Sequence, residues 1–351
     1  MGEVVLVIDG QDYAGWMGVK VKRALEEASA SFELELTNRW PGSGDRRDLR
    51  EHTPCALRLD GKTVIRGVID KVAPRYSAAT HVVKVGGRSL TGQLVDCSCI
   101  IPTGQLRGLS LAAIARRVAE PFGIEVVDLA GDTRPFPRVQ VEQGETIFEV
   151  LERLARQRGV FLTDDAEGRL IIRRRSTDLQ GALELGKNVL EAEAEFGGRD
   201  QYSEYTVKGQ LEGADQWDGA TSARGSGRAV DASVPIHRPL IVLAERQGDG
   251  ISLGDRARHE AALRRGRARR WTYTIQSWLR PDGALWETAE EVEVTDSFMG
   301  LESERLLVIE TEFSIDDGGE ITRLTVAQPE GFDLREDKVA VKQAAAGWDA
   351  L

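Results

Sequence analysis

Residues 68–89 read VIDKVAPRYSAATHVVKVGGRS, which is a long strand-like run, a turn of small and polar residues, and a second run. Residues 308–331, VIETEFSIDDGGEITRLTVAQPEG, follow the same plan near the end of the chain. Strand-like runs on both sides of a short turn are typical of a β-hairpin. The amino-acid sequences of the two stretches differ, so what is repeated is the arrangement of two strands around a turn. The sequence therefore indicates two β modules of similar design, with other material inserted between and within them.

The first ninety residues favour β-structure throughout. Phe32, Leu34 and Leu36 alternate with polar residues, which is the period of a half-buried strand. Asp60-Gly61 separates two strand-like runs, and because both residues tolerate positive φ, a hairpin turn is predicted there. Several short strands joined by such turns favour a small barrel or sandwich. The predicted runs are 4–8, 31–37, 56–59, 63–69 and 81–85.

The next eighty residues favour an α/β arrangement. Gly86-Gly87 are expected to let the chain leave the last strand of the first module. Ser110 is placed to cap a following helix, whose apolar residues recur at helical spacing. Thr146 and Glu149 form the pattern of a capping box at the start of a second helix.

Strand-like sequence returns from about residue 176. The segment 210–235 has many small residues and little apolar periodicity, so a long, mobile loop is predicted there. The segment 251–270 is predicted to be a helix, and strands follow it. The tail beyond Gly331 is charged and then alanine-rich, and we expect it to be weakly ordered.

Overall charge and cysteine content narrow the possible functions. The net charge of −11 argues against a general nucleic-acid binder, which usually has a basic balance. Cys55, Cys97 and Cys99 are too few for a disulfide framework, so a reducing environment is the simpler assumption. The first apolar run, 4–8, is too short for a signal core or a membrane span, and we expect no targeting segment.

A phosphate-binding loop is the first candidate site. Gly87 and Gly92 bracket four residues, as the glycines of such a loop do. Gln93 and Leu94 stand where the loop needs a lysine that reaches the phosphates and a hydroxyl that binds Mg²⁺. A turn that needs small residues is therefore the preferred interpretation.

A zinc site is the second candidate, because His52, Cys55, Cys97 and Cys99 could together supply four ligands. Cys97 and Cys99 are separated by one residue, whereas zinc knuckles more often use a longer spacer. Isoleucines follow Cys99, and cysteine is often a small buried hydrophobe. We therefore expect Cys97 and Cys99 to pack where two domains meet, and we assign no metal.

Charged clusters are the remaining candidates. Seven arginines lie between Arg256 and Arg270 and could bind phosphates, but the acidic surplus of the chain favours ion pairs with its own carboxylates or a neighbour's. Asp164-Asp165 and Asp316-Asp317 could suggest hydrolysis, but each pair is predicted at a hairpin tip, where aspartate stays solvated. No serine-hydrolase elbow or zinc-protease motif is present. We assign no catalytic or cofactor-binding residue and expect neither enzymatic activity nor a cofactor.

A series of motifs in fixed order carries a family resemblance. They are GWMGV, DGKTVIRGVID, VKVGGRSLTGQLVDCS, LSLAAIARRVAEPFGIEV, GETIFEVLERLARQRGVFL, EYTVKGQ, HRPLIVLAE, the arginine-rich helix, DGALW and TVAQPEGF. Together they resemble the baseplate hub proteins of Mu-like contractile-tailed phages and, more distantly, the late-control D group of P2-like phages. The resemblance runs from about residue 3 to 335 and leaves out 211–232 and the tail.

The resemblance implies an α+β fold, mainly β, that contains two related antiparallel β-barrel domains like those of tail tubes and two smaller α/β insert domains. Three such chains would present six barrels, which matches a six-fold tube to a three-fold spike. The expected parts are a first barrel at 1–90, an α/β domain at 91–175, a discontinuous second barrel at 176–210 and 291–330, an inserted α/β domain at 211–290, and a tail at 331–351.

The resemblance also implies a structural function. We expect a homotrimeric ring in the tail baseplate of a virion, assembled in the host cytoplasm, that joins the tail tube to the central spike. The expected partners are the spike, tail-tube or distal-tail proteins and other baseplate proteins, with no membrane insertion. DNA would pass through the ring without specific binding, and we expect carboxylates to dominate the bore. The alternatives are a hub of a tailocin or a type VI-like injection machine and, much less favoured, a cell-wall hydrolase.

Overall fold

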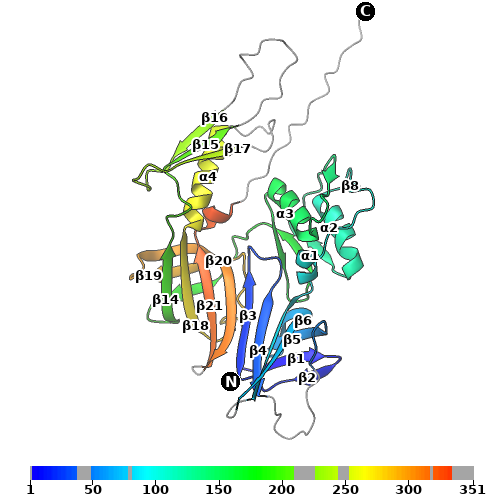
Figure 1. Cartoon of the computed structure of the whole chain (residues 1–351). Helices are drawn as coiled ribbons and strands as arrows, with labels where there is room; N and C mark the ends of the chain where they lie inside the picture. The colour runs from blue at the N-terminus through cyan, green and yellow to red at the C-terminus, as the bar shows by residue number, and fades with distance from the viewer. Residues whose placement is uncertain are drawn as a thin grey trace, which may run out of the picture. The chain divides into compact units, whose positions relative to one another are not determined.

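The computed structural model describes residues 2–37, 49–77, 81–208, 226–243, 253–316 and 319–333. Strands make up most of its regular structure, so the expectation of a mainly β protein is confirmed (Figure 1). The chain divides into two compact units. The body comprises Met1–Glu195 and Arg270–Pro329, and the inserted unit comprises Phe196–Arg269 and Glu330–Leu351.

The first β module of the body contains seven strands in the order β2-β1-β5-β6-β7-β4-β3. The predicted turn at Asp60-Gly61 is confirmed, because it joins β5 to β6 and both residues have positive φ. The strands are β1 (Val4–Ile8), β2 (Gln11–Tyr13), β3 (Gly18–Ala24), β4 (Ser31–Thr37), β5 (Pro54–Leu59), β6 (Lys62–Tyr76) and β7 (His81–Ser89).

The second β module contains a hairpin that repeats the layout of β6 and β7. Strand β20 is 16 residues long and β6 is 15, and each pairs with a following strand of nine residues. Each long strand is interrupted by a register shift, between Ile69 and Lys71 in β6 and between Val308 and Glu310 in β20. The module consists of β13 (Leu179–Glu184), β14 (Val189–Phe196), β18 (Arg269–Gln276), β19 (Glu291–Asp296), β20 (Leu301–Asp316) and β21 (Gly319–Ala327).

The two modules share one sheet of thirteen strands. Strand β3 of the first module pairs antiparallel with β20 of the second, so that Val21 lies opposite Phe313. The path runs from β14 to β2 and stays open, so the described strands do not form the closed barrels that we expected. The reason is that the outer edge of β3 pairs with β20 and not with the far end of its own module. One apolar core lies under both modules.

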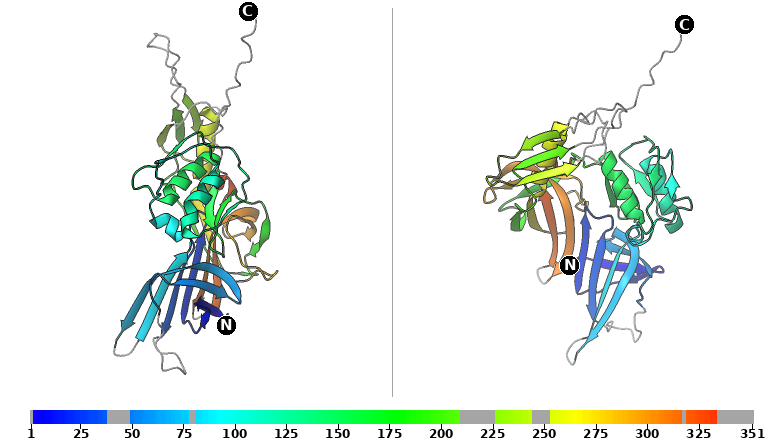
Figure 2. Two further views of the ribbon diagram at one scale, coloured as in Figure 1. Left: turned by 90° about the vertical axis from the view of Figure 1, so that its right-hand side faces the viewer. Right: turned by 45° about the horizontal axis from the view of Figure 1, so that its top comes forward.

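The α/β part of the body follows β7 and has its own core. Ser110 caps α2 (Leu111–Ala119), and Thr146 and Glu149 form the predicted capping box of α3 (Ile147–Arg158). The two helices pack against each other beside short strands (Figure 2). The other elements are α1 (Gly92–Asp96), β8 (Gln105–Leu106), the 3-10 helix η1 (Glu120–Phe122), β9 (Val126–Asp128), β10 (Val139–Gln140), β11 (Phe161–Asp164) and β12 (Leu170–Arg173).

The inserted unit is a three-stranded sheet in the order β16-β15-β17, packed against one helix. Its elements are β15 (Glu204–Lys208), β16 (Ser226–Val230), β17 (Pro239–Leu243), α4 (Leu253–Arg267) and the 3-10 helix η2 (Pro329–Phe332). The expectation of a loop throughout 210–235 is wrong at β16, where Arg228 pairs opposite Thr206. Within the expected loop, residues 231–235 lie outside any helix or strand, and residues 210–225, like the tail residues 334–351, lie outside the described residues.

Strand pairing also moves two elements across the expected domain boundaries. We expected β15 to belong to the second barrel, but it pairs with β16 and β17 of the inserted unit. We expected β18 to belong to the insertion, but it pairs with β21 of the second module. The insertion therefore interrupts the chain between β14 and β18.

Candidate assembly interface

The seam between the two modules is held by charges on one face and apolar side chains on the other. Lys20 lies 2.8 Å from Glu312, and Lys22 lies 3.1 Å from Glu310. Because side chains alternate across a strand, Val21 and Phe313 point to the opposite face, where both are buried in the core. The seam thus combines backbone pairing, cross-strand ion pairs and a continuous core.

The charged face continues over the strands on both sides of the seam. Lys84 of β7 lies 2.9 Å from Glu35 of β4. On the other side of β20, Arg323 of β21 lies 3.2 Å from Glu312. Neighbouring strands therefore carry opposite charges that form cross-strand ion pairs, so this face is neither uniformly acidic nor uniformly basic.

Besides the end strand β2 and strand β13, two further stretches of the sheet have no strand on their outer side among the described residues. Strand β14 is the end of the sheet path, and β18 is its single neighbour in that path. In β6, Lys62–Val68 pairs with β5, but Lys71–Tyr76 pairs with β7 alone. Such edges present unpaired backbone N–H and C=O groups that can bind another strand.

A buried ion pair fixes the α/β part onto the β modules. Nε of Arg23 in β3 lies 3.2 Å from Oδ1 of Asp164 at the end of β11. The backbone N–H of Ala30 donates to Oδ2 of Asp164 at 2.9 Å, and the Arg23 guanidinium also donates to the Val64 carbonyl at 2.9 Å. Asp164 therefore accepts hydrogen bonds from two segments of the first module.

The environment of Arg23 keeps it charged. Burial opposes its charge, but the nearby carboxylates of Asp164 and Glu287 outweigh that effect and raise the Arg23 pKa. A cavity of about 30 Å³ beside Arg23 is lined in part by Trp286 and Phe313. It has room for water but not for a substrate, so this is a structural joint.

The stretch that resembles a phosphate loop is a strand followed by a short helix. Gly87 lies inside β7, where a Cβ atom would come within 2.4 Å of the Val68 carbonyl oxygen and 2.6 Å of the Phe32 ring. The expectation that Gly86-Gly87 let the chain leave the strand is therefore wrong, because β7 continues to Ser89. The glycine at position 87 instead permits close approach of neighbouring strands.

Arg88, between the two glycines of this stretch, already has two carboxylate partners. Its guanidinium lies 2.5 Å from Asp96 and 2.6 Å from Asp70. The hydrogen bonds that Arg88 donates to Asp96 and to Asp70 raise the Arg88 pKa, and the hydrogen bonds that Asp96 accepts from Arg88 lower the Asp96 pKa. These pairs join α1 to β6 and β7, so Arg88 has a structural partner on each side.

The two buried cysteines lie in different cores, and Cys97 is partly exposed. Cys55 is buried in the core of the β modules, and Cys99 is buried in the core of the α/β part. The expectation that Cys99 packs at a junction between domains is therefore wrong. Within the described ranges, no group of three histidine, cysteine or acidic side chains is placed to hold a metal ion.

The candidate acidic pairs differ from their expected placement. Asp164 is buried against Arg23, so the expectation of a solvated hairpin tip is wrong for this residue. Asp165 is in the turn, where its carboxylate accepts hydrogen bonds from the backbone N–H groups of Glu167 and Arg169. Asp316 ends β20, and Asp317 lies outside the described residues.

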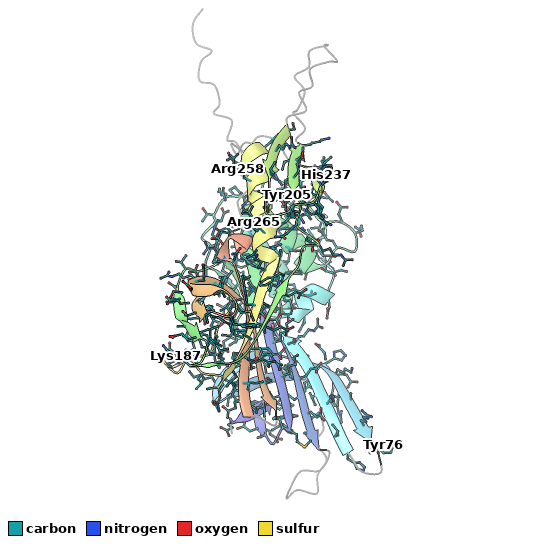
Figure 3. The ribbon with its side chains drawn as sticks, turned by 90° about the vertical axis from the view of Figure 1, so that its left-hand side faces the viewer. Tyr76, Lys187, Tyr205, His237, Arg258 and Arg265 are labelled. Carbon is teal, nitrogen blue, oxygen red and sulfur yellow. The ribbon has the colours of Figure 1, made fainter. Side chains whose placement is uncertain are left out.

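The arginine-rich segment makes contacts within the chain. Arg265 of α4 lies 3.0 Å from the buried carboxylate of Asp231, with Tyr205 in the adjoining sheet (Figure 3). Arg267 donates to the Gly331 carbonyl at 3.1 Å. Arg270, in the body, lies 3.3 Å from Glu26. These contacts agree with a structural use of the arginines, in which they pair with carboxylates and carbonyls of their own chain.

Two features important for assembly were not singled out in the sequence. The first is Arg23, whose partner Asp164 is far away along the chain. The second is the pair of open edges, which depend on which strands become neighbours. The only sequence signals were the alternation of Lys20 and Lys22 with apolar residues and the run of Glu191, Glu193 and Glu195. Among the described helices, none is both long enough and apolar enough to span a membrane.

Three family models match successive parts of the chain. Residues 3–89 match the N-terminal domain of Mu phage baseplate assembly protein GpP-like proteins, and residues 91–174 match the second domain of baseplate hub protein gp44-like proteins. Residues 252–335 match the fourth domain of Mu phage baseplate assembly protein GpP. Baseplate hub protein gp44 of Escherichia phage Mu is 32% identical over 337 residues, which cover 94% of this chain and 88% of gp44.

Solved structures show the same fold over nearly the whole chain. The 43 kDa tail protein of prophage MuSo2 from Shewanella oneidensis is 34% identical, with a TM-score of 0.83, over 95% of this chain and 100% of that one. The tail protein from Neisseria meningitidis MC58 is 21% identical, with a TM-score of 0.79, over 95% and 99%. The E. coli c3393 protein, a type VI secretion component, shares the fold at 14% identity and a TM-score of 0.56, over 92% and 76%.

Proposed function

The chain belongs to the baseplate hub family of Mu-like phages, and from this we propose that three copies form a ring in the baseplate of a contractile tail. The observation that most directly supports a ring is the repeated strand plan joined by β3 and β20 within one chain. Three copies would carry six such modules. A three-fold ring of this kind could meet a six-fold tube on one side and a three-fold spike on the other.

The proposed partners follow from this arrangement. They are two further copies of the chain, the central spike, tail-tube or distal-tail proteins, and other baseplate proteins. The location would be the tail baseplate of a virion that assembles in the host cytoplasm. The role is structural and non-enzymatic, which is in keeping with the description of the Mu relative as a baseplate hub protein. Each module would curve as part of a barrel-like wall around the bore.

The charged face of the joined sheet is the face that we propose to line the bore, because the opposite face carries the apolar core. Its lysines and glutamates form cross-strand pairs, as between Lys20 and Glu312. Such a lining would be close to neutral, which differs from the carboxylate-dominated bore that we expected. DNA would meet no continuous track of unpaired cations and could slide through without specific binding.

Mass measurement of the purified chain tests the ring. Light scattering and mass photometry at micromolar concentration should give three times the 38.6 kDa chain mass, alone or after addition of the cognate spike protein. Image averages of the assembly should show a central hole. A strict monomer that also fails to assemble with the spike would contradict the proposal.

A hub of a tailocin or a type VI-like machine is the second candidate. It is favoured by the shared fold of the E. coli c3393 protein, a type VI secretion component. The ring would be similar in each case, so mass alone would not separate them. Isolation of the particles that contain the chain would do so, because a phage carries a DNA-filled head, a tailocin has none, and a type VI machine remains attached to the cell.

A further inference from the structure

The two β modules correspond strand by strand around their long hairpins. The register shift after Ile69 in β6 matches the shift after Val308 in β20. Counting from these shifts, Lys71 corresponds to Glu310 and Tyr76 corresponds to Ile315. The strand orders β6-β7-β4-β3 and β20-β21-β18-β14 correspond as well. Strand β14 therefore has the place in the second module that β3 has in the first.

The corresponding stretches differ in whether they have a partner strand. Strand β3 occupies the outer side of β20 along Glu310–Ile315. The corresponding stretch of β6, Lys71–Tyr76, has no strand on that side among the described residues. The outer side of β14 is likewise without a neighbouring strand there, apart from an isolated bridge between Leu185 and Val189.

We infer that β14 of one copy pairs antiparallel with Lys71–Tyr76 of β6 in a second copy, and thus repeats between chains the β3–β20 seam that joins the modules within a chain. The closing of three such seams into a ring rests on the proposed function, whereas the pairing of the two edges rests on the internal repeat. The partner is a second copy of this chain, because the open edge and its counterpart are both present in every copy.

Charge distinguishes the two seams. At the internal seam, β3 contributes Lys20 and Lys22, and β20 contributes Glu310 and Glu312. At the proposed seam the signs are exchanged. Strand β14 presents glutamates at 191, 193 and 195, which lie opposite the core-facing Ala192 and Ala194, and β6 presents Lys71 and Arg75. None of these five charged side chains forms an ion pair with a described residue.

The exchanged signs disfavour two other pairings between copies, namely β3 with β6 and β14 with β20. If β3 met β6, lysines would face Lys71 and Arg75, and if β14 met β20, glutamates would face Glu310 and Glu312. Like charges directly opposite each other destabilise a strand pair. Glutamates of β14 therefore select β6 of another copy over a second copy of β20.

Apolar side chains beside both edges are left exposed in the single chain. Tyr76 of β6 is 82% exposed, at the strand end (Figure 3), and Leu190 of β14 is 60% exposed. Beside the internal seam, Ile315 of β20, which corresponds to Tyr76, is 7% exposed, and Val21 of β3 is 3% exposed. Pairing of the two edges would extend the core across the seam in the same way.

Pro74 limits which strands can bind the β6 edge. It lies within Lys71–Tyr76, which pairs with β7 on one side only, and proline within a sheet is placed where its missing N–H faces the open side. The edge therefore offers one donor fewer than a regular strand, which discourages indiscriminate pairing. Binding at this edge then depends more strongly on the matching charges and on the apolar contacts.

Cross-linking between copies tests the pairing directly. In a full-length Cys97→Ser background, Glu193→Cys on β14 and Ala73→Cys on β6 should be joined between copies by a short bismaleimide reagent. The matched control combines Glu193→Cys with Glu33→Cys, which is exposed in the middle of the same face on β4. The variant with Glu193→Cys and Ala73→Cys should give cross-linked dimers and closed trimers, and the control should give no cross-linked product.

The cross-linked products and the mass together distinguish the proposed strand pairing from the proposed three-fold ring. A trimer by light scattering that does not cross-link through positions 73 and 193 would overturn the pairing and leave the ring standing. Cross-linked dimers and open chains without closed trimers would support the pairing and contradict the three-fold ring. A monomer that does not cross-link would contradict both.

Charge reversal tests why these edges select each other. Glu191→Lys with Glu193→Lys should weaken self-association at least about tenfold, and so should Lys71→Glu with Arg75→Glu. All four changes in one chain should restore association, which loss of folding could not do. Glu302→Lys with Glu304→Lys, an equal charge change at exposed positions of β20, should leave association unchanged. If the variant with all four changes folds but does not regain self-association, the charge argument is overturned.

Discussion

The guanidinium of Arg23 lies 3.2 Å from the carboxylate of Asp164, and the two side chains are 12% and 0% exposed. This pair joins β3 to the end of β11 across 141 positions of sequence. Because both charges are shielded from water, removal of either one leaves the other without its main partner. The α/β part therefore depends on this joint for its place on the β modules.

Arg23→Leu should lower the free energy of unfolding by about 3 to 5 kcal/mol, because it leaves a buried carboxylate uncompensated. Urea unfolding of the full chain measures this loss. The double variant Arg23→Leu with Asp164→Leu should lose less than the single variant. Arg66→Gln is the matched control, since its pair with Glu167 also links the two parts but is largely exposed, and it should cost at most about 1 kcal/mol. Equal losses for Arg23 and Arg66 would contradict the assignment.

Gly87→Ala should destabilise the body by about 1 to 3 kcal/mol, because the added methyl group would overlap the Val68 carbonyl and the Phe32 ring. Gly86→Ala is the matched control on the adjacent residue, where the nearest atom to a Cβ would be 3.6 Å away. Thermal and urea unfolding of both variants provide the measurement. The interpretation fails if both substitutions have the same effect.

Cys55 should react with maleimide much more slowly than Cys97 in the folded chain. Burial, with a smaller contribution from Asp70, raises the pKa of Cys55 to about 12, so its thiolate is scarce at neutral pH. Cys97 is partly exposed. Peptide mass spectrometry after short labelling pulses measures both rates, and urea should remove the difference. Equal rates in the folded protein would show that Cys55 is accessible.

The inserted unit should lose stability in acid through Asp231. Burial would raise its pKa, but hydrogen bonds from Ser233 and Arg265 outweigh burial and lower it. A lowered folded-state pKa means that the charged form is stabilising above the ordinary value of 3.8, and this contribution is lost as the pH falls below it. Asp231→Asn should cost about 2 kcal/mol at pH 7 and much less near pH 3, measured by hydrogen exchange of α4 amides. A cost that does not depend on pH would contradict this.

Local and periodic features could be predicted from the sequence. The capping box at Thr146 and Glu149 and the Asp60-Gly61 turn use residues close to each other in the chain, and both are confirmed. The repeated hairpin plan was visible for the same reason, because each copy is a continuous stretch. Asp164 was misplaced because its environment is set by Arg23, which no local pattern reveals.

Strand neighbours could not be predicted from composition or period. Strands β15 and β18 both have the alternation of half-buried strands. Nothing in their amino-acid sequences shows that they belong to different sheets. Barrel closure was over-predicted for the same reason, since β3 could have closed its own module but pairs with β20. The open edges follow from these pairings and could be recognised only with the sheet order in hand.

The β3–β20 seam also sets a demand on synthesis of the chain. Ala24 pairs with Glu310, near the other end of the 351 residues, so β3 leaves the ribosome long before its partner exists. At the usual rate of translation this interval lasts roughly 15 to 60 s. During it, Lys20 and Lys22 stand on an uncovered strand edge, and lysines on such an edge oppose aggregation of nascent chains. The same two residues thus protect the growing polypeptide before they pair with the glutamates made last.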